Sequence, residues 1–120
     1  MTRRIPSDQW ISFLNSFSKQ HEGWLVTLEV LDPELGAQTE ASELPLEGIS
    51  GSTAPKTISI SLGDAPSNHL THTVNSPTQL WLSRTSQGAD EALEIESIDG
   101  AKTLLRFRSA MPTELVDGLI

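Results

Sequence analysis

The chain has 120 residues, about the length of one domain, and its 16 acidic and 8 basic residues give a net charge of −8. This charge has the wrong sign for a protein that grips a nucleic-acid backbone. The absence of cysteine excludes disulfides, thiolate nucleophiles and cysteine-bound metals. No run approaches the roughly 20 apolar residues of a membrane span, and no apolar segment follows Arg3-Arg4 as it would in an export signal. We therefore expect a single cytoplasmic domain over residues 1–120 that binds neither nucleic acid nor membrane.

The first predicted element is an amphipathic helix. Ser7 is a suitable N-cap, and Gly23 is placed to end the helix in a left-handed conformation. Between them, apolar side chains recur at the spacing of one helical stripe. The members of this stripe are Trp10, Phe13, Leu14 and Phe17. Such a stripe must be buried against another element.

After Gly23 the apolar period changes from 3.6 to 2, which predicts strands. Residues 24–31 form the first, with Trp24, Val26, Leu28 and Val30 on one face. A turn at 32–36 leads into a polar strand at 37–43. Pro45 cannot donate to a ladder, so 44–49 is predicted to be an irregular edge or corner, and 50–56 a loop. Residues 57–62 alternate again, with Ile58, Ile60 and Leu62 facing inward.

Four more strands are predicted at 69–74, 78–84, 92–97 and 102–108, and the last two form a hairpin around Asp99-Gly100. A two-residue turn would place Glu94 on the face that holds Leu105 and Phe107. A three-residue turn over 98–100, with Gly100 left-handed, instead gathers Leu93, Ile95, Leu105 and Phe107 on one face. Because a one-residue slip inverts every side chain, the pattern selects the three-residue turn, which also sets Glu96 opposite Lys102.

These elements predict a mainly β (α+β) fold. An N-terminal helix packs on a small antiparallel β-barrel or strongly curved sheet of about six or seven strands. The C-terminal segment 111–118 is predicted to add one helical turn over an open end.

The sequence also resembles a family of small bacterial proteins of unknown function, domain of unknown function 5335. The segments that carry the resemblance are Ile5-Pro6, Trp10, Phe13, Phe17-Ser18, His21, 23–30 (GWLVTLEV), 44–49 (LPLEGI), 69–72 (HLTH), 93–96 (LEIE), 99–100 (DG), 103–108 (TLLRFR) and 116–118 (VDG). They span nearly the whole chain. The resemblance implies a bacterial single-domain protein and supplies no activity and no functional residue.

His69 and His72 are the only closely spaced histidines. On a helix they would converge and could hold a metal, but on a strand residues three apart point to opposite faces. His72 then faces inward with Leu70 and Val74, and His69 faces out. A shared metal site would need a bulge or an outside ligand such as His21. His72 is therefore predicted to be a core histidine, with a functional role as the alternative.

Trp81 and the C-terminal arginines are the other candidates for binding. Trp81 faces away from Leu80 and Leu82, either as an exposed aromatic beside Arg84 or, as we favour, as the floor under the helix stripe. Residues 20–55 hold seven acids and no base, whereas Arg84, Lys102, Arg106 and Arg108 cluster late in the chain. These basic residues form either a groove for an anion or a solvated face that balances the acidic segment.

The sequence contains no nucleophile elbow or phosphate-binding glycine loop. We therefore expect a non-enzymatic module, without a cofactor or metal, that binds a protein partner, itself or a small anion. The residues expected to bind are His72, Trp81, Arg84, Arg106 and Arg108. The alternative is a small metal-dependent or histidine-based enzyme that uses His69 and His72.

Overall fold

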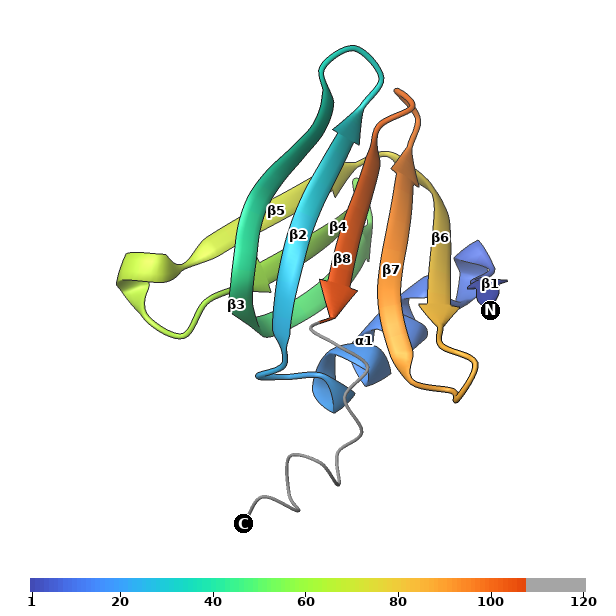
Figure 1. Cartoon of the computed structure of the whole chain (residues 1–120). Helices are drawn as coiled ribbons and strands as arrows, with labels where there is room; N and C mark the ends of the chain where they lie inside the picture. Colours follow the sequence, from blue (N-terminus) through green and yellow to red (C-terminus); the bar gives the residue numbers. More distant parts are fainter. Residues whose placement is uncertain (108–120) are drawn as a thin grey trace.

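The structure is a computed structural model that describes residues 1–107. Its strands form one antiparallel sheet in the order β1-β6-β7-β8-β2-β3-β4-β5, with one α-helix at the N-terminal side (Figure 1). The strands are β1 (Thr2–Arg4), β2 (Leu25–Asp32), β3 (Gly36–Thr53), β4 (Lys56–Leu62), β5 (Leu70–Asn75), β6 (Pro77–Arg84), β7 (Asp90–Ser97) and β8 (Lys102–Phe107). The mainly β prediction is confirmed. The segment 111–118 and Arg108 lie outside the described residues.

The sheet folds over on itself at β3, so that β4 and β5 cross behind β2 and β8 (Figure 1). The first part of β3 pairs with β2, and the part from Leu46 onward pairs with β4. Within the described residues β1 and β5 each have one neighbour and remain edges, so the sheet does not close into the predicted barrel. It has eight strands rather than six or seven. The apolar core lies between its two halves.

Pro45 lies where β3 changes partners. It is opposite Leu25 in the β2 ladder, and its carbonyl accepts a hydrogen bond from the Gly63 amide. Although proline has no N–H to donate, the hydrogen bonding to the chain before β2 continues, because the next amide, that of Leu46, donates to the Trp24 carbonyl. A register shift follows between Leu46 and Gly48. The bend expected at 44–49 is therefore present, but inside one continuous strand, and the loop prediction is wrong for residues 50–53.

The N-terminal helix closes one side of the core. Ser7–Gln9 form a 3-10 turn (η1), and the helix α1 runs from Trp10 to Gln20, so Ser7 makes no side-chain cap. The stripe packs chiefly against β3, with Trp10, Leu14 and Phe17 buried and Phe13 partly buried. The Trp10 indole N–H donates to the Ile5 carbonyl at 2.8 Å, which anchors the start of the helix. Gly23 does have a positive φ, but it lies beyond the helix end.

The remaining strand predictions hold with small changes in their ends. The alternation in β4 and β5 is confirmed, because Ile58, Ile60, Leu62 and Val74 are buried. In the β7–β8 hairpin, Ser97 bonds to Ala101 across the three-residue turn, Gly100 has a φ of +90° and Glu96 is opposite Lys102. Trp24 is the exception. It lies before β2, is 42 % exposed and packs edge-on against His21 rather than joining the inner face.

The strand β1 was not predicted from the sequence. Its three residues pair with β6, with Arg3 opposite Leu82 and Arg4 opposite Trp81. A segment this short, with two arginines, has too few side chains to display a period of two. Its pairing brings the N-terminal arginines beside β6.

Candidate functional site

A polar pocket lies at one open end of the folded sheet. We call it the rim pocket. It has a volume of about 240 Å³ and is reached between β5 and the β7–β8 turn. Its lining residues are Val30, Asp32, His72, Thr73, Val74, Asn75, Ser97, Asp99, Ala101 and Thr103. No lysine or arginine is among them, and no aromatic ring other than the His72 imidazole.

Hydroxyl groups and a carboxylate of the β7–β8 hairpin form one wall of the rim pocket. Ser97 and Thr103 are both buried, and they continue the inward-facing rows of their strands. The Ser97 hydroxyl donates to Asp99, whose Oδ1 also accepts the Ala101 amide at 3.0 Å. These hydrogen bonds, that from Ser97 foremost, lower the pKa of Asp99 below its usual value of 3.8. Asp99 is therefore a fixed negative charge at neutral pH.

His72 lies on the opposite wall, half-buried on the inner face of β5. Its Nε2 is 3.4 Å from the Thr103 hydroxyl oxygen. Burial lowers the pKa of His72 below its usual 6.5 and outweighs the opposing effect of the Glu40 carboxylate. The ring is neutral at pH 7, so one of its two nitrogens is a hydrogen-bond acceptor. The inward prediction for His72 is confirmed.

The three histidines do not form a shared site. His69 is exposed, and its Nε2 is 3.4 Å from the Glu47 carboxylate. His72 faces the core from the other side of the same chain segment, and His21 contacts Asp90. Among residues 1–107, no three histidine, aspartate or glutamate side chains are arranged to hold a metal ion.

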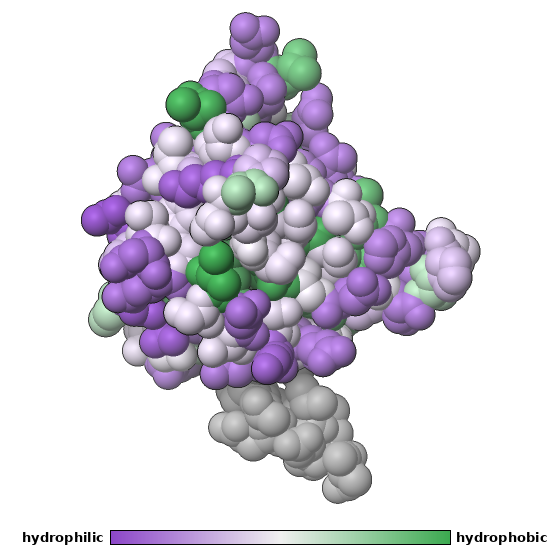
Figure 2. Space-filling view, turned by 180° about the vertical axis from the view of Figure 1, so that it is seen from behind, coloured by the Kyte–Doolittle hydropathy of each residue, from purple (hydrophilic) through white to green (hydrophobic). Residues whose placement is uncertain are grey.

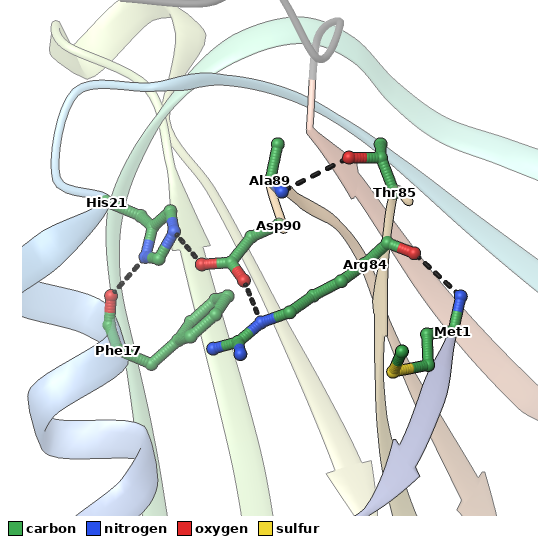
Figure 3. A network of polar contacts seen from close by, with 7 residues as sticks. All are labelled: Met1, Phe17, His21, Arg84, Thr85, Ala89 and Asp90. Atoms are coloured by element: carbon green, nitrogen blue, oxygen red, sulfur yellow. Dashed lines mark hydrogen bonds and ion pairs between the residues drawn. The ribbon is translucent and has the colours of Figure 1, made fainter. Parts of the chain in front are cut away.

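A second polar cluster, the His21–Asp90–Arg84 network, joins the end of α1 to the last residue of β6 and the first residue of β7 (Figure 3). His21 is 2 % exposed, with Nδ1 2.8 Å from the Phe17 carbonyl and Nε2 2.8 Å from Asp90 Oδ2. The other oxygen of Asp90 accepts from Arg84 Nε at 2.8 Å. The His21 ring stacks on Phe17 at 4.0 Å. Arg84 is one of the residues that the sequence suggests for binding an anion. In the structure Asp90, itself held by His21, orients the Arg84 side chain.

The other predicted binding residues are dispersed. Trp81 lies on the outer face between Arg4 and Glu94 in the ladder, so it is not the floor under the helix stripe, which β3 provides. Arg106 is on the same outer face, and its Nε contacts Glu29 at 2.6 Å. This ion pair joins the acidic segment 20–55 to the basic residues late in the chain, as expected if the basic residues form a solvated face that balances the acidic segment. The described residues do not bring Arg84, Trp81 and Arg106 to one groove.

Sequence reasoning missed the participants beside His72 and His21. Thr103 and Ser97 had a usable signal, because they fall on inward positions of two strands that are otherwise apolar. Asp90 had none. Its contact with His21 spans 69 positions of the chain and depends on the packing of α1 across the sheet.

The fold and pocket define a helix-capped, folded-over antiparallel β protein with a polar pocket at its open end. The chain belongs to the family of unknown function DUF5335, whose model matches residues 1–116. It is also 27 % identical over 111 residues to an uncharacterized protein of Aquifex aeolicus (strain VF5), covering 92 % of this chain and 96 % of that protein. No solved structure matches the chain significantly. None of the helices in residues 1–107 has the length and apolarity needed to cross a membrane.

Proposed function

We propose that the protein is a non-enzymatic binding module whose rim pocket takes a small organic cation with an ammonium or guanidinium group. One observation carries the proposal: two carboxylates and a half-buried neutral imidazole line the pocket, and no basic side chain balances them. A cation that entered the pocket would meet acceptors on opposite walls. The negative net charge of the chain would attract it over longer distances.

The supply of hydrogen-bond acceptors supports a ligand that donates. Asp32 Oδ1 accepts the amides of Glu34 and Leu35, and Asp99 Oδ1 accepts Ser97 and Ala101. The Oδ2 atoms of both aspartates have no hydrogen-bond partner among residues 1–107 and are available to a ligand. An ammonium group carries three donors and no acceptor, which matches this arrangement.

Other ligand classes fit the rim pocket less well. An anion would face Asp32 and Asp99 without a cation to offset them. A sugar is commonly held by an aromatic side chain that covers one face of the ring, and the lining offers only an imidazole. The reverse face of the molecule carries its apolar surface in separate spots among polar residues (Figure 2), so the proposal does not depend on a large apolar docking face.

Catalysis by His72 is less well supported than binding. The distance of 3.4 Å between His72 Nε2 and Thr103 Oγ1 exceeds the usual reach of a nucleophile–base pair, and the Ser97 hydroxyl donates to Asp99 instead of to a histidine. The cytoplasmic location stays a prediction, which cell fractionation would test.

An NMR titration of the ¹⁵N-labelled protein with 1,4-diaminobutane tests the proposal. We expect saturable shifts centred on the rim pocket, and none with 1,4-butanediol, which has the same length without the charges. Asp99→Asn, which keeps a side-chain carbonyl for the turn, should weaken binding about tenfold, equal to ~1.4 kcal/mol. The matched control, Glu91→Gln, removes the charge of an exposed residue that does not line the pocket and should leave the affinity unchanged. Equal losses in both variants, or shifts spread over the acidic surface, would contradict the proposal.

A further inference from the structure

The two edges of the sheet within residues 1–107 differ in how they are protected against further pairing. Charged side chains, prolines, bulges and a short length are the usual features that keep another strand from an edge. β1 has only three residues, and two of them are arginines. β5 has six residues (LTHTVN), which include no charged residue, proline or glycine, and its register against β4 is uninterrupted. The β5 edge is therefore open to another strand.

The main-chain groups of alternate β5 residues point away from β4. The Ser76 amide donates to the carbonyl of Lys56, which is its partner when the β4–β5 register is continued by one residue. Hydrogen-bonded pairs alternate with non-hydrogen-bonded pairs in an antiparallel ladder, so every second residue of β5 bonds to β4. The others direct their N–H and C=O groups to the open side. These residues are Thr71, Thr73 and Asn75.

The side chains of β4 and β5 agree with this assignment. Thr73 is opposite Ser59, and their hydroxyl oxygens are 3.2 Å apart. Thr71 is opposite Ser61, with a distance of 3.3 Å between the hydroxyl oxygens. Opposite side chains approach most closely in non-hydrogen-bonded pairs. The outer face of these two strands therefore carries a row of hydroxyl groups, whereas the half-buried His72 is on the inner face.

The rim pocket lies along this open edge. Four consecutive residues of the chain, 72–75, line one side of it, and Asp32 and Asp99 line the other. The turns that follow β2 and β7 extend past β5 on the side away from β4 (Figure 1). A strand added beside β5 would direct alternate side chains to the same inner side as His72. Those side chains would meet the two aspartates, so a positive charge on them complements the site.

We propose that β5 is a docking edge for an extended basic peptide segment, which pairs with β5 and places a lysine or arginine side chain in the rim pocket. The proposal rests on the proposed function, because the lysine side chain carries the same aminobutyl group as 1,4-diaminobutane. Main-chain hydrogen bonds along β5 supply affinity, and the pocket supplies specificity for the basic side chain. A second copy of the chain fits the edge less well, because its β5 carries no cation to offset the aspartates.

Titration of the full-length ¹⁵N-labelled protein with the peptide acetyl-Val-Thr-Lys-Thr-Val-amide tests the proposal. In a strand the lysine and valines of this peptide share one face, and the threonines share the other, beside the hydroxyl row of the protein. We expect saturable shifts of the β5 amides and of the rim-pocket residues. Replacement of the lysine by norleucine, which has a similar length and no charge, should weaken binding at least tenfold.

Two N-methylated peptides test the main-chain pairing on the wild-type protein. Methylation of both threonine nitrogens blocks one edge of the peptide, and methylation of both valine nitrogens blocks the other. Only one edge of an added strand bonds to β5, so one analogue should lose at least tenfold in affinity and the other should not. Equal affinities of the two analogues would overturn the proposed pairing.

A proline substitution tests the same pairing from the protein side. Thr71→Pro removes an N–H from the open side of β5 but no hydrogen bond to β4, and Thr71 does not line the rim pocket. This variant should bind the peptide at least fivefold more weakly and still bind 1,4-diaminobutane. The matched control is Thr2→Pro. Because the Arg84 amide donates to the Met1 carbonyl, the Thr2 N–H points away from β6, and its loss should leave peptide affinity unchanged.

The results separate this proposal from the proposed function. If 1,4-diaminobutane gives no saturable shifts, both are wrong. If 1,4-diaminobutane binds but the lysine peptide binds no better than its norleucine analogue, peptide docking is wrong and the cation site stands. Sedimentation of the protein alone provides a further check. Self-association that Thr71→Pro abolishes would assign the β5 edge to a second copy of the chain and overturn the proposal.

Discussion

The imidazole of His21 lies between the carbonyl oxygen of Phe17 and the carboxylate of Asp90, with a nitrogen–oxygen distance of 2.8 Å on each side. A carbonyl only accepts, so Nδ1 carries a proton. The other ring nitrogen, Nε2, faces the Asp90 carboxylate. This arrangement ties the end of α1 to the start of β7, and the imidazole packs among the rings of Phe17, Trp24 and Phe107.

Removal of the His21 side chain is expected to destabilise the protein strongly. His21→Ala should lower the free energy of unfolding by about 3 kcal/mol, because it leaves a cavity and removes the partner of one oxygen of the mostly buried Asp90 carboxylate, which keeps only its contact with Arg84. Urea denaturation measures the change. His69→Ala, which removes an exposed histidine beside Glu47, should change the free energy by less than ~0.5 kcal/mol. Similar losses in the two variants would show that the His21 contacts do not hold α1 to the sheet.

Helix docking should depend on the buried stripe and not on the rest of α1. Leu14 is fully buried, and Leu14→Ala should cost about 3 kcal/mol of unfolding free energy through the cavity that it leaves. Ile11, on the same helix, is 43 % exposed, and Ile11→Ala should cost under ~1 kcal/mol. Thermal and urea unfolding of the two variants provide the comparison. A cost for Ile11→Ala equal to that for Leu14→Ala would place the wrong face of the helix in the core.

The three-residue turn of the β7–β8 hairpin needs a left-handed residue at position 100. Gly100 has a φ of +90°, and a Cβ there would lie 3.3 Å from Pro33 Cγ. Gly100→Ala should therefore lower the unfolding free energy by about 1–2 kcal/mol. Gly100→Asn should cost less, because asparagine adopts left-handed conformations more readily. If Gly100→Ala lowers the unfolding free energy no more than Gly100→Asn does, the turn does not have this geometry in solution.

Acid should destabilise the protein through His72. Because burial lowers the folded-state pKa below the unfolded value of 6.5, the unfolded chain binds a proton that the folded chain refuses. The contribution of His72 is therefore fully present above pH 6.5, declines as the pH falls below it, and levels off below the folded pKa. Urea unfolding at several pH values should show a smaller decline over this range in His72→Gln than in the wild type. Identical pH profiles would contradict the burial of this ring.

The parts of the fold that were predictable from sequence are those with local or alternating signals. The stripe at Trp10, Leu14 and Phe17 fixed the buried face of α1, and the apolar period of the final hairpin selected its turn. From the sequence alone, 44–49 is predicted to be an irregular edge or corner, because Pro45 cannot donate to a ladder. In the structure Pro45 lies opposite Leu25 of β2, and its carbonyl accepts a hydrogen bond from the amide of Gly63, the residue after β4.

The candidate sites were less predictable, because they depend on contacts between distant segments. His72 was placed correctly on the inner face, but its proximity to Asp99 depends on how β5 crosses behind β8. Arg84 pairs with Asp90 at the start of β7, and His21 at the end of α1 contacts Asp90 from the other side. No periodicity in the sequence indicates these contacts between distant residues.

The measurement that tests the account most directly is the affinity of the rim pocket for 1,4-diaminobutane at pH 8 and at pH 5. Protonation of His72 places a cation beside the proposed ligand, so binding should be several-fold weaker at pH 5, and His72→Gln should remove most of this difference. An affinity that is the same at both pH values in the wild type, or a pH dependence that persists in His72→Gln, would contradict the assignment of this pocket as the binding site.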